Sequence, residues 1–418
     1  MKFVEIDNKT IRHNLLNLRH LVFEVTESCN LNCKYCAYSD LYHGYDNREG
    51  ENMPFAKVKQ IIDYLYQLWT ENYSEGVDTI RSISFYGGEP LLNVPFIKQV
   101  IDHVENLEKK GMVFAYAMTT NAMLLDKYMD FLVEKGFNLL ISLDGDEFAH
   151  SYRVDHSGNN SFPRVFRNLK LLQEKHPEYF KSKVSFNSVL HNRSDIETVY
   201  RFIYAHFGKA TRIAALNHVG ICDTKKDEFV KMFRNPAESF YNSGKCSVLE
   251  YEMTTETPRV AALADYIQFQ SGNVFDTYNN LYMNKDAMSF APTGSCTPFV
   301  FRMFISVNGK ILPCERVDHQ FSMGQVYDDR VELDENFVAN THNYYVSKYV
   351  QQCNNCAVNR FCEICVYQVD DIEQENASCP DFHSTKRLEK RNNAIFKFLE
   401  AYPHYYKRIT DENMFKIV

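Results

Sequence analysis

The chain has 418 residues, 45% of them hydrophobic, so it has enough apolar material for two or three domains and is not a disordered protein. Its formal net charge of −8 argues against nucleic acid as a main partner. The sequence has no apolar run long enough to span a membrane, and the acidic start Met1–Glu5 does not resemble a signal peptide. We therefore expect a cytoplasmic protein with neither nucleic acid nor membrane as a partner.

The first half of the chain alternates β-rich runs with helical patterns. The strand candidates are 21–25, 82–86, 113–118, 138–143, 184–189 and 211–217. The helix candidates between them start near Pro54 and cover about 94–107, 127–135, 162–174 and 195–207. These six βα repeats predict an α/β fold, a partial (β/α)6 TIM-like barrel that is open because a complete barrel needs more strands.

Three cysteines follow the first strand candidate. Cys29, Cys33 and Cys36 form a C-x3-C-x2-C run. Thiolates at this spacing suit an iron–sulfur cluster or a zinc ion. A four-iron cluster with only three cysteine ligands keeps one iron open for a small molecule. The alternative is that these cysteines are incidental or bind zinc.

Other unusual residues also follow strands, where chemistry collects in folds of this class. Gly87-Gly88-Glu89-Pro90 comes after the second strand, and its glycine pair lets a ligand approach the backbone closely. Asn121 follows the third strand, Ser142 and Asp144 close the fourth, and Leu190 follows the fifth. We expect them near the cysteine run.

A second cysteine array lies in the last third of the chain. Its members are Cys296, Cys314, Cys353, Cys356, Cys362, Cys365 and Cys379. The runs 301–307 and 310–312 flank Asn308-Gly309 and predict a β-hairpin with Cys314 at its exit. Short C-x-x-C knuckles by themselves fit a zinc ribbon equally well. Because the chain has 12 cysteines and we expect a reducing compartment, metal ligation is favoured over disulfides.

The cysteine run and the Gly87–Pro90 segment together resemble the radical SAM superfamily. The resemblance implies that S-adenosylmethionine binds the open iron of a [4Fe-4S] cluster, and that its reductive cleavage gives a 5′-deoxyadenosyl radical that abstracts hydrogen from the substrate. It also implies which residues surround S-adenosylmethionine. Tyr35 and Leu190 would lie at the adenine and Ser142 at the ribose, and Arg153 or Arg164 would meet the carboxylate. The amino group would be held by Gly87, Gly88, Glu89 and Pro90, and Asn121 and Asp144 would lie at neighbouring strand ends.

The second array resembles the SPASM extension of radical SAM peptide maturases, which holds two auxiliary [4Fe-4S] clusters. By position, Cys353, Cys356, Cys362 and Cys379 would bind the outer cluster, and Cys296, Cys314 and Cys365 the inner one. The spacing Cys362-x2-Cys365 is one residue shorter than the usual pattern. The inner cluster has three obvious ligands, so either Cys222 or Cys246 completes it or one iron is open to substrate.

Two residues are candidates for direct contact with the substrate. Glu315 follows Cys314 at a position where sulfatase-maturing relatives carry an aspartate that acts as a base, and a carboxylate with a raised pKa would suit that role. The alternative is a salt bridge with Arg316 or a solvated surface position. Tyr38 matches a tyrosine near the substrate of those relatives, whereas Tyr86 stands where they carry glutamine.

The predicted domains are a barrel at 1–217, a bridging or substrate region at 218–290, a SPASM domain at 291–383 and a helical segment at 384–418. We expect an oxidoreductase that matures a precursor peptide or protein by oxidation or crosslinking, with an electron donor such as flavodoxin or ferredoxin. The alternative enzyme is an anaerobic sulfatase-maturing enzyme that forms formylglycine from cysteine or serine. A second alternative is a non-catalytic zinc or electron-transfer protein.

Overall fold

The computed structural model describes residues 2–71, 79–241, 260, 262–264, 266–267, 289–290, 292–359, 362, 364–370, 372–374 and 377–411. It divides into two compact units. The barrel unit comprises Asn8–Ser239 and Pro298–Val338, and the second unit comprises Met1–Asp7, Phe240–Thr297 and Ala339–Val418. The hairpin region thus belongs to the barrel unit, although the sequence grouped it with the cysteine-rich domain. The predicted region 218–290 lies largely outside the described residues, as does Cys246.

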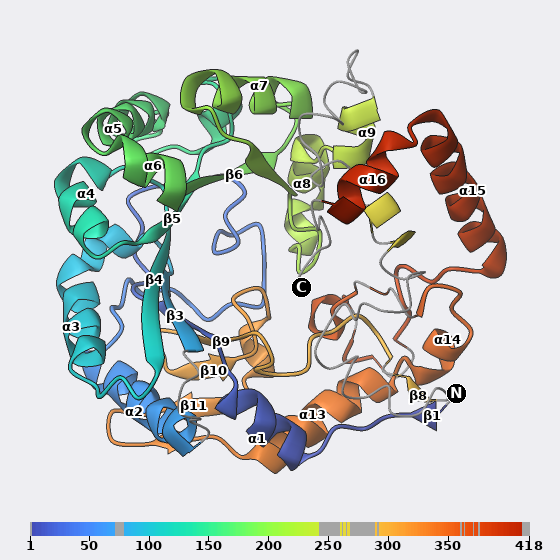
Figure 1. Cartoon of the computed structure of the whole chain (residues 1–418), viewed down its shortest axis with the longest axis horizontal. Helices are drawn as coiled ribbons and strands as arrows, with labels where there is room; N and C mark the ends of the chain where they lie inside the picture. The colour runs from blue at the N-terminus through green and yellow to red at the C-terminus, as the bar shows by residue number, and fades with distance from the viewer. Residues whose placement is uncertain are drawn as a thin grey trace. The chain divides into compact units, whose positions relative to one another are not determined.

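The barrel unit contains the predicted parallel sheet. Its six strands pair in chain order, and they are β2 (His20–Glu24), β3 (Thr79–Tyr86), β4 (Met112–Thr120), β5 (Asn138–Ser142), β6 (Val184–Leu190) and β7 (Thr211–Ala215). The helices that connect them lie on the outer side of the curved sheet in Figure 1, and they are α2 (Phe55–Glu71), α3 (Val94–Glu105), α4 (Leu125–Glu134), α5 (Phe162–Lys175), α6 (Pro177–Lys183) and α7 (Ile196–Phe207). The prediction of an open partial barrel is confirmed.

Local sequence signals explain the ends of these elements. In α7, the Asp195 side chain accepts the backbone N–H of Thr198 in a capping box, and Gly208 ends the helix with φ +66°. In α2, Val58, Ile62 and Leu65 recur at helical spacing and are fully buried or nearly so. The buried stripe of each helix covers the outer face of the sheet.

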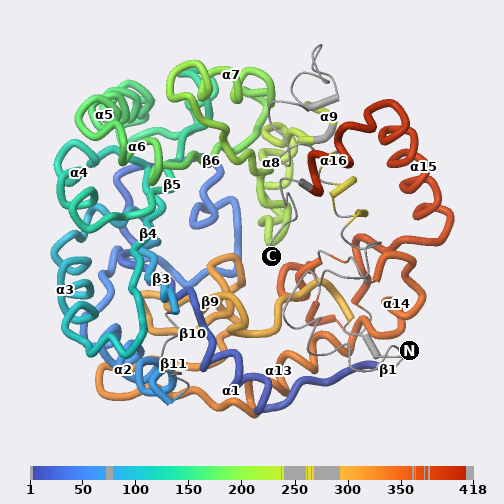
Figure 2. The backbone as a smooth tube through the Cα atoms, in the orientation of Figure 1, coloured from blue at the N-terminus to red at the C-terminus, as the bar shows by residue number. Residues whose placement is uncertain are grey.

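Four further strands extend the sheet beyond β2, and the sequence did not predict how. The predicted hairpin forms from β9 (Arg302–Ile305) and β10 (Lys310–Leu312), followed by β11 (Gly324–Val326) and β12 (Val331–Glu332). Strand β9 pairs parallel to β2, with Val22 opposite Phe304, and the last three strands pair antiparallel. Figure 2 shows this late segment of the chain beside β2 and β3. As a result, the exit of β10 with Cys314 and Glu315 belongs to the barrel unit.

The inner face of the sheet is polar near β2, β3 and β9. Alternation places His20, Glu24 and Arg302 on this face. The His20 ring Nε2 lies 2.5 Å from Ser84 Oγ on the neighbouring strand. Burial and the nearby Arg302 guanidinium lower the pKa of His20 to about 4, so its imidazole is neutral at pH 7. Polar groups on the inner face of a barrel signal a site rather than a plain core.

The remaining helices of the barrel unit are short or lie outside the βα repeats. They are α1 (Asn8–Leu16), α8 (Lys226–Met232) and α9 (Pro236–Tyr241, whose last two residues belong to the second unit). Arg81 of β3 reaches the carboxyl end of α1, where its guanidinium donates to the carbonyl oxygens of Leu18 at 2.7 Å and Leu16 at 3.3 Å. This bond ties α1 to the sheet.

The second unit contains most of the late helices. They are α13 (Glu335–Ser347, which begins in the barrel unit), α14 (Val350–Asn354), α15 (Thr385–Ala401) and α16 (His404–Asp411). Strand β1 (Lys2–Phe3) pairs parallel with β8 (Ser289–Phe290) in a separate sheet. Ile395, Phe398, Tyr405 and Ile409 pack with Val260 and Leu263 in a small core, so the segment predicted to be helical at 384–418 does contain two helices, each with a buried face. None of the helices described combines the length and hydropathy needed to cross a membrane.

Candidate active site

The three N-terminal cysteines lie together in the loop after β2. Burial raises the pKa of the Cys29 thiol to about 11 and that of Cys33 to about 12, and each thiol is close enough to disfavour ionisation of its neighbours. Burial also raises the pKa of Cys36. Three thiolates in this loop therefore need a compensating positive charge, which a bound metal group supplies.

The surroundings of these thiols suit negatively charged sulfur. The backbone N–H of Leu31 lies 3.4 Å from Cys29 Sγ, and the Asn121 side-chain amide lies 3.7 Å from it. The Arg153 guanidinium favours ionisation of Cys33 and Cys36. Donors and cations around the sulfurs stabilise iron–sulfur clusters and tune their potentials. The residues present fit a cluster.

A zinc ion and a four-iron cluster require different arrangements of three thiolates. Among the described parts of the chain, no group of three or more His, Cys, Asp or Glu side chains converges so as to hold a metal ion. Zinc gathers its thiolates at about 2.3 Å. A four-iron cluster takes one thiolate on each liganded iron, so its cysteines are spread around a larger group.

The glycine pair lets two loops approach each other. A Cβ at Gly87 would lie 2.6 Å from the carbonyl oxygen of Thr26, and one at Gly88 would lie 2.0 Å from that of Ser28. Gly87 also has φ +125°, a conformation that favours glycine. The N–H groups of Gly88 and Glu89 donate to the same two carbonyl oxygens at 2.8 and 2.9 Å. In the described structure, glycine is therefore required because the cysteine loop lies against this backbone. That a ligand also comes close to the two glycines stays a prediction.

Glu89 connects the ends of β3 and β4. Its carboxylate accepts hydrogen bonds from Thr120 Oγ1 at 2.6 Å, the Asn121 backbone N–H at 2.8 Å and the Leu91 N–H at 3.1 Å. Burial raises its pKa to about 7 despite these donors. Pro90 starts the short helix Pro90–Asn93. This acid thus orders the strand ends around the predicted S-adenosylmethionine site.

The side chain of Asn121 bridges β4 and the cysteine loop. Its amide donates to the Asn30 side-chain oxygen at 2.7 Å, and its own oxygen accepts the Met123 N–H at 2.9 Å. The predicted closeness of Asn121 to Cys29 is therefore observed.

Asp144 is fully buried and accepts four hydrogen bonds from three residues. Its carboxylate accepts bonds from Arg153 Nε at 2.9 Å and Nη2 at 3.1 Å, from the Val189 N–H at 2.9 Å and from the Tyr35 hydroxyl. Burial opposes the charge, but the Arg153 guanidinium holds the pKa of Asp144 below its usual range. Because Tyr35 lies between Cys33 and Cys36, this network fixes the cysteine loop to the ends of β5 and β6.

The other residues predicted for S-adenosylmethionine lie at strand ends or on α5. Ser142 closes β5, and Leu190 closes β6 and is fully buried. Arg153 lies beside the cysteine loop. Arg164 lies on α5, where its Nη2 is 3.8 Å from Asp126. Their roles toward the cofactor stay predictions.

Tyr38 lies in an aromatic cluster next to the cysteine loop. Its hydroxyl is buried and has no hydrogen-bond partner among the described residues. The Arg48 guanidinium lies 3.8 Å from its ring centroid, and the Tyr45 ring meets it edge to face at 5.0 Å. Tyr86 and Glu24 lie close enough to affect its ionisation. A buried hydroxyl without a partner is available for a bound molecule.

Glu315 is paired, but with Arg302 rather than Arg316. One guanidinium nitrogen of Arg302 lies 2.8 and 3.0 Å from its two carboxylate oxygens. Burial opposes the charge, yet Arg302 holds the pKa of Glu315 below its usual range. The expectation of a raised pKa is therefore wrong, because the sequence did not reveal that β9 pairs beside β2 and brings Arg302 along. Glu315 lies near Tyr86 and Tyr45.

Four cysteines of the second unit form a group. Burial raises the pKa of Cys353, Cys362 and Cys379, and the nearby thiols, Cys356 among them, raise it further. Backbone N–H groups of Thr293, Ile364 and Asp381 bond to their sulfurs. This is the set predicted for the outer cluster, and its donors fit such a group.

The set predicted for the inner cluster is divided. Cys296 and Cys365 lie near each other in the second unit, where the Ser295 side chain bonds to Cys365. Cys314 and Cys222 belong to the barrel unit. The ligand set of that cluster stays a prediction.

Residues 23–203 match the protein-family model of the radical SAM superfamily. This segment is a radical SAM domain. Such a domain implies a [4Fe-4S] cluster and S-adenosylmethionine, and the chain is a radical SAM enzyme.

Similarity to characterised proteins extends past this domain. A cysteine-type anaerobic sulfatase-maturating enzyme from Clostridium novyi (strain NT) is 24% identical over 350 residues, which is 81% of this chain and 85% of that protein. The radical SAM cyclopropyl synthase TigE of Paramaledivibacter caminithermalis is 28% identical over 170 residues, 40% of this chain and 34% of that protein. The solved structure of native anSMEcpe with bound AdoMet and Cp18Cys peptide superposes with a TM-score of 0.57 at 18% identity, covering 94% of this chain and 99% of that one. The radical SAM enzyme described here shares their fold.

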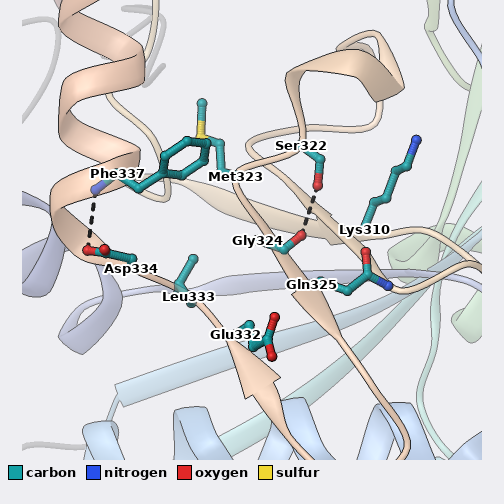
Figure 3. Close-up of a pocket in the computed structure, with 9 residues that line it drawn as sticks. All are labelled: Lys310, Ser322, Met323, Gly324, Gln325, Glu332, Leu333, Asp334 and Phe337. Carbon is teal, nitrogen blue, oxygen red and sulfur yellow. Dashed lines mark hydrogen bonds between the residues drawn. The ribbon is translucent and has the colours of Figure 1, made fainter.

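One pocket lies away from this site. It has a volume of about 550 Å³ and lies between β10–β12 and the start of α13, as Figure 3 shows. Its lining residues are Lys310, Ser322, Met323, Gly324, Gln325, Glu332, Leu333, Asp334 and Phe337. None of them is a predicted site residue, and the radical SAM chemistry is assigned elsewhere.

Sequence reasoning missed two charged residues that shape the site. Glu24 is 1% exposed in the apolar strand β2, where it pairs with Arg48 at 2.7 Å and accepts the Val307 N–H at 3.0 Å. An acid within an apolar run signals a buried partner, so Glu24 was detectable. Arg48 carries no such signal, because the loop that contains it folds back over Tyr38 only in three dimensions.

Proposed function

We propose that this radical SAM enzyme oxidises a side chain of a peptide or protein, and that conversion of cysteine or serine to formylglycine is the first reaction to test. The supporting observation is the similarity to the sulfatase-maturating enzyme over 81% of this chain and 85% of that protein. The sequence favoured peptide maturation by crosslinking and kept this reaction as an alternative. The length of the similarity now favours the alternative.

The cofactor residues are those of the site at the strand ends. Cys29, Cys33 and Cys36 would hold the cluster, and Glu89, Asn121, Ser142, Asp144, Arg153, Tyr35 and Leu190, with Gly87, Gly88 and Pro90, would surround S-adenosylmethionine. The bound pair supplies the radical that removes a hydrogen atom from the substrate. The chain's own part is to fix these groups, and the buried Asp144–Arg153 pair, at 2.9 Å, is one such restraint.

The inner face near β2, β3 and β9 would hold the substrate side chain. Tyr38 offers a buried hydroxyl without a partner, and the Arg302–Glu315 pair offers a charged acceptor. For a cysteine substrate, oxidation removes a hydrogen atom from Cβ, the thiol proton and one further electron. Glu315 would accept that proton, and hydrolysis of the resulting thioaldehyde releases sulfide and leaves the aldehyde. The lowered pKa of Glu315 makes it a weak base, so its effect depends on position.

The remaining electron needs an acceptor. Two auxiliary [4Fe-4S] clusters would provide a route, one on Cys353, Cys356, Cys362 and Cys379, the other on Cys296, Cys314 and Cys365. The grouping of the first four thiols supports the outer cluster. A small electron carrier such as flavodoxin or ferredoxin would be the redox partner.

A second candidate function is crosslink formation in a ribosomally made peptide. It is favoured by the similarity to a cyclopropyl synthase and by Tyr86, whose ring meets Phe304 edge to face at 6.4 Å where sulfatase-maturing relatives carry glutamine. The two functions differ in the product that they form. Formylglycine made from cysteine loses sulfur and gains oxygen, whereas a crosslink loses only hydrogen. Formylglycine made from serine also loses only two hydrogens, so the aldehyde group is what distinguishes it from a crosslink.

The test is an anaerobic assay with reconstituted enzyme, S-adenosylmethionine, a reductant and the Cp18Cys peptide. We expect 5′-deoxyadenosine and an aldehyde-bearing peptide, detected by mass spectrometry and hydrazide capture. Cys33→Ala should abolish both products. Release of 5′-deoxyadenosine without any aldehyde from either the cysteine peptide or its serine analogue would contradict formylglycine formation. Crosslinked product from a candidate precursor peptide would then support the second function.

A further inference from the structure

The amino-terminal half of α15 is attached to the four-thiol group of the second unit. The helix begins shortly after Cys379. The Ala357 N–H donates to the His383 carbonyl oxygen at 2.8 Å, next to Cys356. Arg387 in the first turn pairs with Asp381 at 3.0 Å, and the Asp381 N–H bonds to the Cys379 sulfur. A protein that docks on this half of α15 is therefore close to these thiols.

The outward face of this helix carries three lysines together with two exposed acids, Glu389 and Glu400. Lys386, Lys390 and Lys397 follow each other at spacings of four and seven residues and are all exposed, and we call them the α15 lysine stripe. The helix buries the opposite face, with Ile395 and Phe398 in the core. The stripe is thus presented to solvent, although the whole chain has a net charge of −8.

The dipole of α15 does not explain the position of Lys386. The first turn of α15 has no acidic residue, and a cation at that end opposes the helix dipole. Lys386 and Lys390 are like charges four residues apart, a spacing that disfavours a helix. Sequences depart from such helix preferences mainly at functional sites.

We propose that the α15 lysine stripe is the docking surface for an acidic one-electron carrier protein that exchanges electrons with a cluster at Cys353, Cys356, Cys362 and Cys379. In the reductive direction the carrier is oxidised by one electron and the cluster goes from [4Fe-4S]2+ to [4Fe-4S]1+, with no bond made or broken. A negatively charged chain repels an acidic carrier, so a local cationic surface is what brings the two together. The exposed ring of Phe382, beside the thiols, adds apolar contact.

This docking depends on the auxiliary cluster of the proposed function but not on the substrate. The experiment uses the intact, reconstituted enzyme and reduced flavodoxin as the carrier. Stopped-flow absorbance follows cluster oxidation state at several salt concentrations, and EPR identifies the cluster that is reduced. The variant is Lys386→Glu with Lys390→Glu, which should fold, because glutamate is favoured near a helix start. The matched control is Lys109→Glu with Lys127→Glu, two exposed lysines of the barrel unit.

We expect the second-order rate for the α15 variant to fall at least tenfold at low salt and to lose most of its salt dependence, while the control keeps the wild-type rate. Photoreduction by a small deazaflavin should be equally fast in all three proteins. An α15 variant reduced as fast as wild type, or a loss shared by the control or by the deazaflavin reaction, overturns the inference. The docking inference is also overturned if the enzyme makes modified peptide but binds only enough iron for the N-terminal cluster. The proposed peptide oxidation would then still stand.

Discussion

Replacing Asp144 by asparagine should destabilise the barrel unit strongly. The Asp144 carboxylate is 0% exposed and compensates the Arg153 guanidinium, which is itself 8% exposed. Asparagine keeps the shape but removes the charge and turns an N–H2 group toward a cation. Breaking a buried ion pair from one side costs about 3–5 kcal/mol, because the remaining charge stays buried. At about 2 °C per kcal/mol for a unit of this size, the thermal midpoint should fall by roughly 6–10 °C.

The measurement is the thermal and urea unfolding of the anaerobic protein. Asp130→Asn is the matched control, since Asp130 pairs with Lys175 and His176 at the surface and its side chain is 67% exposed. We expect a thermal midpoint close to that of the wild type there, because solvent screens this pair. The double variant Asp144→Leu with Arg153→Met removes both charges, and most of the stability should return.

An Asp144→Asn midpoint shift no larger than that of Asp130→Asn would refute the ion-pair explanation. So would a double variant less stable than Asp144→Asn, since an uncompensated Arg153 would then not be the cause. A further consequence concerns the cluster: because Asp144 fixes Tyr35 between two cysteine ligands, the single variant should bind less iron per chain on reconstitution.

Three more predictions concern the site. Glu89 has a pKa of about 7 in the folded protein, whereas a free glutamate has one near about 4.3. The free energy of unfolding of the wild type should therefore fall relative to that of Glu89→Gln by up to ~3 kcal/mol as the pH rises from about 4.5 to 7. If the free energies of both proteins depend on pH with the same slope, Glu89 is ionised throughout this range. Cys356→Ala should lose about four irons and all modified product but keep some 5′-deoxyadenosine release, and retention of product would argue against the outer cluster. Arg302→Met should raise the pKa of Glu315. Because Arg302 also holds this carboxylate in position, product formation should fall roughly tenfold at unchanged S-adenosylmethionine affinity. If the rate of product formation and its pH dependence do not change, Glu315 takes no part in the reaction.

The order of elements in the barrel was predictable because each is encoded locally. The strands are runs of apolar and β-branched residues, and the helices carry a buried stripe with caps such as Asp195 and Gly208. The grouping of the three N-terminal cysteines, and that of Cys353, Cys356, Cys362 and Cys379, was likewise predictable, since the members of each group are close in sequence. Residues directly after parallel strands lie at one edge of the sheet, and for this reason Glu89 and Asn121 meet near Cys29 as expected.

The partners of charged residues were not predictable, because they are set by contacts distant in sequence. Arg302 reaches Glu315 because β9 adds in parallel to β2, a pairing that joins residues about 280 positions apart and has no local signature. The adjacent Arg316 was the natural expectation from the sequence alone. The same holds for Arg153, predicted to face the cofactor carboxylate, whose bidentate pairing with Asp144 depends on the turn after β5.

These contacts explain how a loop with almost no regular structure can hold a cluster in a fixed place. Residues 26–53 contain no helix or strand of regular length, so their backbone groups pair in turns, in isolated β-bridges and with side chains. The Glu27 carboxylate accepts the N–H groups of Glu49, Gly50 and Glu51 at 2.8 to 3.2 Å. Arg48 returns to Glu24 on β2, and Asn121 holds Asn30 from β4. The loop is thus restrained from several strands at once, and a site restrained in this way loses little conformational freedom when its ligand binds. The charged residues that the sequence could not place are therefore the ones that make the predicted cysteine site rigid.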